Sequence, residues 1–127
     1  MPQVRGEFDV KVTPVQDEDK TLVRMTLDKR YHGDLDGTAK GQMLSADANG
    51  KDSGVYVAIE RVTGTLQGRS GSFLLNHTGI MTKGVPHLSI AIVPDSGSGQ
   101  LTGLSGTMDI KIEGGKHFYI LDYTLPQ

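Results

Sequence analysis

The sequence contains no cysteine and no tryptophan, and it has only 4 tyrosines and 3 phenylalanines among 127 residues. Without cysteine the chain can form no disulfide bond and perform no thiol chemistry, and it carries no sign of an oxidising compartment. No run of apolar residues approaches the roughly 18 that a membrane-spanning helix needs, and the first residues lack the apolar segment of a secretion signal. We therefore expect a cytoplasmic protein that has no membrane partner.

Charge of either sign is also limited, with 22% charged residues and a formal net charge of -2. This balance does not favour nucleic acid as a partner. The four histidines occur singly rather than at the paired spacing of a zinc site, and no phosphate-binding loop is present, so we predict neither metal nor cofactor. The length fits a single domain over residues 1–127, because typical domains have roughly 100–150 residues.

Glycine is abundant, with 17 residues, which implies tight turns or closely approaching strands. Polar and apolar residues alternate with the period of two that is typical of β-strands, and no segment sustains a helical period. Pro14 is expected to end the first strand, the acidic run 16–19 to form a turn, and Asp36-Gly37 to precede the third strand. The predicted strands cover residues 7–12, 23–31, 38–46, 55–66, 70–81, 88–93, 101–112 and 117–125.

Blocks of residues stand in a recognisable order at Tyr56–Leu66, Gly68–Phe73, His77, Gly79, Val93–Gly99, Leu101, Gly103–Gly106 and His117–Tyr119. These ordered blocks resemble the bacterial domain of unknown function 3224 family, and the resemblance covers nearly the whole chain. It implies an all-β fold, an eight-stranded antiparallel barrel of the allene oxide cyclase-like, calycin-like type. It implies no established activity.

A carboxylate and an imidazole are predicted to meet on one face of the central hairpin. A turn at Gln67-Gly68 places Glu60 opposite Leu75 and makes it a diagonal neighbour of His77, at about 7–8 Å between backbones. Partial burial would raise the pKa of Glu60 toward neutrality, so that Glu60 acts as a general base with His77 as the acid or orienting group. The alternative is a buried structural hydrogen bond.

Five further residues are candidates for ligand binding. Tyr56 and Phe73 share the face of the acid/base pair, which is predicted either to line a cavity or to face solvent or a partner subunit. Arg61 would recognise a carboxylate, or is a solvated strand residue. Tyr119 and Tyr123 would donate hydrogen bonds to a ligand oxygen, or are ordinary core residues. Both faces of 55–80 are half apolar, so hydrophobicity alone leaves the inward face open.

These patterns favour a small-molecule-binding barrel, whose catalytic form would be an isomerase or cyclase that uses acid/base assistance in the cavity. The alternative is a non-enzymatic oligomeric scaffold or interaction protein with a packed interior. A cavity of about 300 Å³ or more that reaches Glu60 or His77 would separate the two. Under either reading we expect a homo-oligomer, because apolar residues on both faces of 55–80 exceed what a monomer exposes.

Overall fold

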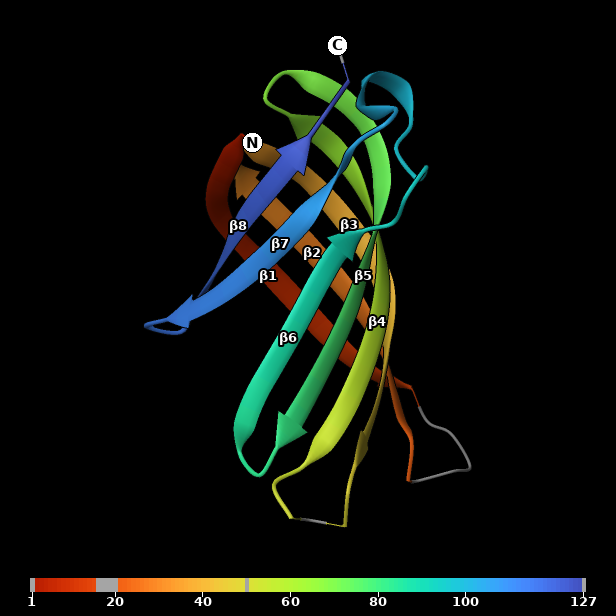
Figure 1. The fold of residues 1–127 in the computed structure, drawn as a ribbon, viewed down its shortest axis with the longest axis vertical. Helices are drawn as coiled ribbons and strands as arrows, with labels where there is room; N and C mark the ends of the chain where they lie inside the picture. Colours follow the sequence, from red (N-terminus) through yellow and green to blue (C-terminus); the bar gives the residue numbers. More distant parts are fainter. Residues whose placement is uncertain (1, 16–20, 50, 127) are drawn as a thin grey trace.

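Eight antiparallel strands close into a barrel in which each strand pairs with its neighbours in sequence order (Figure 1). The computed structural model describes residues 2–15, 21–49 and 51–126. The finding confirms the predicted all-β, eight-stranded antiparallel barrel, whereas its allene oxide cyclase-like type stays a prediction. The strands are β1 (Gln3–Val15), β2 (Val23–Gly33), β3 (Leu35–Asp47), β4 (Gly54–Leu66), β5 (Arg69–Thr82), β6 (Val85–Ile92), β7 (Ser105–Glu113) and β8 (Lys116–Thr124), with a 3-10 helix, η1, at Gly99–Leu101.

The first strand is longer than predicted, because Pro14 does not end it. β1 runs to Val15, and Pro14 pairs with Met25 of β2. β8 pairs with β1 only as far as Phe8, so this part of β1 has a neighbour on one side and tolerates a residue without an N–H group. The predicted acidic turn at 16–19 lies outside the described residues.

β1 also begins earlier than predicted, at Gln3, and β6 begins at Val85 instead of residue 88. The predicted starts of the third and seventh strands were wrong because glycines do more than form hairpin turns. The turn between β2 and β3 is at Gly33-Asp34, where Gly33 has a φ of 104°, and Asp36-Gly37 lies within β3. The seventh strand was predicted to begin at residue 101, but β7 begins at Ser105. Residues 99–104 form η1 and a turn instead, since Gly99 and Gly103 both have positive φ.

Gly37 and Gly64 are needed because the backbones of β3 and β4 meet closely there. The two residues are paired in register, and a Cβ on Gly64 would lie 2.6 Å from the Gly37 Cα and 2.3 Å from the Asp36 carbonyl oxygen. Backbone atoms cannot move aside as a flexible side chain can, so a side chain at this position must separate the strands.

We therefore expect Gly64→Val to lower the free energy of unfolding by roughly 1–3 kcal/mol or more, as overpacking does in well-packed interiors. Urea denaturation measures the change. Thr63→Val, at the neighbouring exposed position, is the matched control and should stay within about 0.5 kcal/mol of the wild type. Equal effects of the two substitutions would contradict the close approach.

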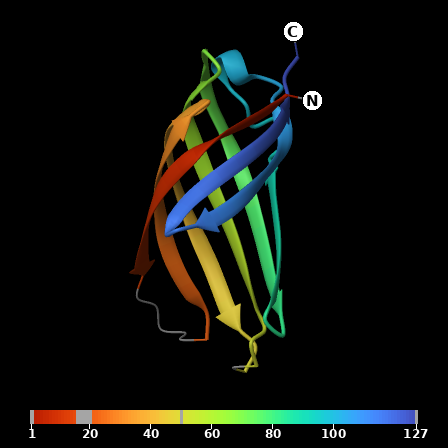
Figure 2. The same ribbon diagram turned by 90° about the vertical axis from the view of Figure 1, so that its left-hand side faces the viewer.

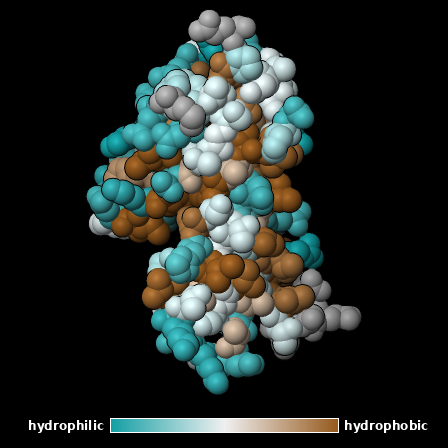
Figure 3. All heavy atoms as spheres, in the orientation of Figure 1, coloured by the Kyte–Doolittle hydropathy of each residue, from teal (hydrophilic) through white to brown (hydrophobic). Residues whose placement is uncertain are grey.

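The barrel is closed at one short seam and open below it. β6 and β7 pair only at Ile90–Met108 and Ala91–Thr107, and below this seam the two strands diverge (Figures 1 and 2). We call the end with the β3–β4 and β5–β6 turns the lower end. In Figure 3 the outline narrows below the β7–β8 hairpin, and hydrophobic atoms border the indentation. The interior is therefore packed above the seam and accessible below it.

The structure settles which face of β4 points inward. Ala58, Glu60 and Val62 are buried, whereas Val57, Ile59 and Arg61 between them are exposed. The described part of the chain has no helix that is long and apolar enough to cross a membrane. The largest fully buried side chains, which fill the packed upper part and its boundary, include Tyr31, Leu35, Leu66, Phe73, Leu75, Leu101, Leu104, Tyr119 and Leu121.

Candidate functional site: a buried polar cluster and an open pocket

The inside of the barrel holds one carboxylate that binds three polar side chains. Lys29 Nζ donates a hydrogen bond to Glu60 Oε2 at 2.7 Å, and His77 Nε2 lies 2.7 Å from the same oxygen. The Tyr31 hydroxyl donates a hydrogen bond to Oε1. Glu60, Lys29 and His77 are all buried, so these contacts replace the water that each group leaves behind. We call Lys29, Tyr31, Glu60 and His77 the polar cluster.

Small residues on β3 let side chains of β2 and β4 meet. Lys29 on β2 pairs with Ala39 of β3, and Glu60 on β4 pairs with Gly41 of the same strand. A Cβ on Gly41 would lie 2.8 Å from the Glu60 Cα, so a larger residue does not fit there. Lys29 Nζ also lies 5.0 Å from the centre of the Phe8 ring, at a distance suited to a cation–π contact.

The cluster keeps Glu60 ionised. Burial alone would raise the pKa of Glu60, but the hydrogen bond from His77 and the positive charge of Lys29 outweigh it and lower this pKa to about 2. The predicted rise toward neutrality was therefore wrong, since the sequence argument did not include Lys29. Burial and the Glu60 carboxylate raise the pKa of Tyr31 well above its ordinary value, so Tyr31 stays a hydrogen-bond donor.

Glu60 and His77 meet as predicted, but three of the predicted ligand-binding residues belong to the packed interior. Phe73 is fully buried in the core. The Tyr119 hydroxyl accepts a hydrogen bond from the Leu35 N–H at 2.9 Å, and the Tyr123 hydroxyl bonds to the Gln67 side-chain oxygen. The contacts of Tyr119 and Tyr123 support the core interpretation of these two residues, and Phe73 packs in the core instead of lining a cavity or facing solvent.

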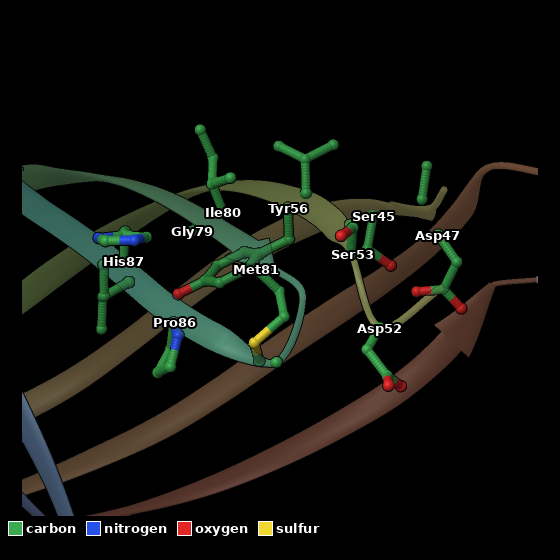
Figure 4. Close-up of a pocket in the computed structure, with 15 residues that line it drawn as sticks. Ser45, Asp47, Asp52, Ser53, Tyr56, Gly79, Ile80, Met81, Pro86 and His87 are labelled. Atoms are coloured by element: carbon green, nitrogen blue, oxygen red, sulfur yellow. The ribbon is translucent and has the colours of Figure 1, made fainter. Parts of the chain in front are cut away.

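A pocket of about 610 Å³ opens at the lower end of the barrel. The Tyr56 side chain lies over Gly79, where its ring fills the space of the missing Cβ. Figure 4 shows Tyr56 reaching across the pocket toward Pro86 and His87, with Asp47 and Asp52 at the opposite end. The lining comprises Ser45, Ala46, Asp47, Asp52–Tyr56, Gly79–Met81, Gly84 and Pro86–Leu88.

The pocket adjoins the polar cluster without including it. Tyr56 lines the pocket, whereas Glu60 and His77 do not, so this pocket is not the expected cavity that reaches Glu60 or His77. Gly79 is nevertheless the next inward position after His77 along β5. The two sites also interact electrostatically, because burial and the Glu60 charge raise the pKa of Tyr56.

Arg61 lies on the other side of the barrel wall from the pocket. It is exposed, pairs with Lys40 of β3, and borders a shallow outer groove of about 530 Å³ with Leu44, Val57 and Ile59. Arg61 therefore faces away from the polar cluster that it was predicted to accompany on a ligand.

Lys29, Tyr31 and much of the pocket lining were not among the site residues predicted from the sequence. The sequence could have pointed to Lys29, because it lies between Leu27 and Tyr31 at the alternate positions of β2 that are otherwise apolar. A charged residue in the inward phase of a strand requires a buried partner of opposite charge. Met81 and Leu88 had no such signal, since each is one more apolar residue in an alternating pattern.

Together these features define a class of protein: an antiparallel β-barrel with a charged pair at its centre and a pocket at one open end. The sequence model of the family described as "Protein of unknown function (DUF3224)" matches residues 4–123, so the chain belongs to this family. A crystal structure of a DUF3224 protein with unknown function from Shewanella oneidensis MR-1 is similar, with 48% identity and a TM-score of 0.94. The match covers 100% of this chain and 98% of that one. No curated protein matches the sequence.

Proposed function

We propose that this barrel binds a small, mainly apolar organic molecule in the pocket at its lower end. The observation that carries the proposal is the pocket itself, because about 610 Å³ lies within the roughly 300–1,000 Å³ of small-molecule sites. Met81 and Leu88 offer apolar contacts, and Tyr56 adds a single phenolic group among them. Such sites typically combine an apolar wall with few polar groups that orient the ligand.

Tyr56 is the group best suited to orient the ligand. A phenol is protonated near neutral pH, and burial raises the pKa of Tyr56 further, so the hydroxyl can donate a hydrogen bond to a carbonyl or hydroxyl oxygen. Asp47 and Asp52 at the opposite end of the pocket disfavour an anionic ligand by repulsion. The geometry therefore favours a neutral ligand with one oxygen near Tyr56.

Catalysis of an isomerisation or cyclisation is the finer form of this proposal, with Glu60 and His77 as the acid/base pair. Two observations support it. His77 Nε2 lies 2.7 Å from Glu60 Oε2, and His77 is the inward-facing residue of β5 next to Gly79, which lines the pocket. A carboxylate with a pKa of about 2 is a weak base, and its two oxygens already bind three side chains. The structure consequently supports binding better than catalysis. The alternative of a non-enzymatic scaffold requires a packed interior, but the interior is packed only above the short β6–β7 pairing.

Binding can be tested with Nile red, a neutral probe that fluoresces in apolar surroundings. Leu88→Asp places a charge in the pocket wall and should weaken Nile red binding at least tenfold, which corresponds to about 1.4 kcal/mol. A fluorescence titration measures the dissociation constant.

Ile112→Asp is the matched control for this experiment. Ile112 is the most exposed of the large hydrophobic residues in the described part of the chain, at 67%, and it does not line the pocket. This variant should bind Nile red as the wild type does. If Leu88→Asp binds the probe unchanged, or if both substitutions weaken binding equally, the pocket is not the binding site.

A further inference from the structure

One ring nitrogen of a buried side chain in the polar cluster has no partner among the described residues. His77 Nε2 lies 2.7 Å from Glu60 Oε2, whereas no hydrogen bond joins the other nitrogen, Nδ1, to any residue of 2–15, 21–49 and 51–126. Lys29, Tyr31 and both carboxylate oxygens of Glu60 all have partners within the cluster. His77 is only 3% exposed, and polar groups of buried side chains are ordinarily hydrogen-bonded. Its unpaired nitrogen therefore points to a ligand.

The unpaired nitrogen is suited to accept a hydrogen bond. An ionised carboxylate can only accept, so the contact with Glu60 places the proton of the His77 ring on Nε2. Lys29 already balances the charge of Glu60, and a second proton on His77 would add an uncompensated charge to a buried site. These contacts favour a neutral ring in which Nδ1 offers its lone pair.

The Nδ1 atom borders space that solvent can reach. Every fully enclosed nitrogen or oxygen of the described side chains has a hydrogen-bond partner, so an atom without one is not fully enclosed. The two nitrogens of an imidazole ring point in diverging directions, and Glu60 lies one inward step above His77 on the neighbouring strand. Nδ1 therefore faces away from Glu60. Because the interior is packed above the seam, solvent reaches this atom from the lower end of the barrel.

The Tyr56 ring stands between the pocket and His77. Gly79 is the next inward position below His77, and Tyr56 is paired with it. A Cβ on Gly79 would lie 2.1 Å from Tyr56 Cε1, so the ring occupies the space above this glycine (Figure 4). Within the described part of the chain, no hydrogen bond holds the Tyr56 hydroxyl, so rotation of the side chain breaks only van der Waals contacts. Such a rotation would join the pocket to His77.

We propose that the binding site extends past Tyr56 to His77, and that its ligand carries a hydroxyl group that donates a hydrogen bond to His77 Nδ1. The ligand is then a mainly apolar alcohol or phenol. An amine would also be a donor, but its positive charge is disfavoured beside Lys29. A hydroxyl oxygen can at the same time accept a hydrogen bond from Tyr56, so one group suits both residues.

This inference rests on the proposed binding function and adds the chemistry of the inner end of the ligand. A ligand without a donor would bury Nδ1 unpaired, and a site built around a polar atom rejects the analogue that cannot pair with it. The acceptor on His77 therefore selects among ligands of similar size and apolar surface.

Thymol, an apolar phenol, and its methyl ether test the need for a donor. Only thymol has an O–H group, and isothermal titration calorimetry should show that it binds at least about tenfold more tightly. A purely apolar pocket would bind the ether at least as well, because methylation adds an apolar carbon. Equal affinities, or tighter binding of the ether, would overturn the role of His77 and leave a pocket that binds apolar molecules. If neither compound nor Nile red binds, the proposed function fails as well.

The nitrogen-15 NMR spectrum of the wild type reports on His77 without any substitution in the cluster. Thymol should shift the resonance of His77 Nδ1, and the methyl ether should leave it in place. His77→Met removes the acceptor, so it should abolish the difference in affinity between the two compounds. Thymol binding that leaves the Nδ1 resonance unchanged would overturn the assignment, whether or not His77→Met folds.

Tyr56→Ala tests the path from the pocket to His77. Diethyl pyrocarbonate acylates unprotonated histidine nitrogens that it can reach, and mass spectrometry of peptides locates the modified ring. Removing the Tyr56 ring should speed the modification of His77 several-fold, with the exposed His32 as the internal reference. Val57→Ala, at the neighbouring outward position, is the matched control and should leave the rate unchanged. The same rate in Tyr56→Ala and in the wild type would overturn Tyr56 as the barrier.

Discussion

Replacing Glu60 with alanine is expected to lower the free energy of unfolding by about 3–5 kcal/mol, the range found when one partner of a buried ion pair is removed. The substitution leaves Lys29 and His77 buried without the carboxylate that both contact. It also removes the acceptor of the Tyr31 hydroxyl. Urea denaturation at neutral pH, followed by circular dichroism, measures the loss.

A double variant separates the charge from the packing. Glu60→Met combined with Lys29→Met removes both members of the ion pair and fills their space with apolar atoms, so it should be more stable than Glu60→Ala. Glu60→Gln keeps the shape but not the charge, and we expect it to lie between the wild type and Glu60→Ala. A loss below about 1 kcal/mol for Glu60→Ala would mean that the contacts in the polar cluster carry little energy.

Acid should unfold this protein in part through Glu60. Its pKa is about 2 in the folded protein and 4.5 in the unfolded chain, so the folded state binds the proton less readily. A carboxyl whose pKa is lowered contributes stability that is fully present above the unfolded pKa and disappears as the pH falls through the folded pKa. This difference corresponds to about 3 kcal/mol, lost between pH values near 4.5 and near 2.

The measurement is the free energy of unfolding in urea at several pH values, for the wild type and for Glu60→Gln. The two proteins share their other carboxylates, so the difference between their curves isolates residue 60. That difference should be constant at neutral pH and shrink as the solution becomes acidic. Parallel curves down to pH values near 2 would contradict a carboxylate with a strongly lowered pKa.

Local patterns predicted the β4–β5 hairpin well, because a tight turn determines the register of both strands. The turn at Gln67-Gly68 gives Leu66 opposite Arg69, and from there the pairing of Ala58 with His77 follows by counting. The proximity of Glu60 to His77 was predictable for that reason. The last hairpin joins β7 and β8, which correspond to the predicted strands 101–112 and 117–125, and it places Tyr119 opposite Ile110.

Counting residues from a turn cannot predict contacts between strands that are not neighbours. Lys29 reaches Glu60 across β3, so the contact depends on the register of two strand pairs and on the small residues between them. The outward valines and isoleucine of β4 hid the direction of the strand, because an apolar residue usually signals the inside.

The ends of the described chain meet in the same sheet. β1 pairs with β8, and the Tyr123 N–H donates a hydrogen bond to the Pro2 carbonyl. Because each strand pairs with its neighbour in sequence, the topology is a ring in which the chain ends occupy one of the gaps between strands. A circular permutant that joins these ends and opens the chain at the exposed Lys83-Gly84 turn would retain every strand pairing. The order of the strands around the barrel, rather than the point where the chain starts, therefore defines this fold.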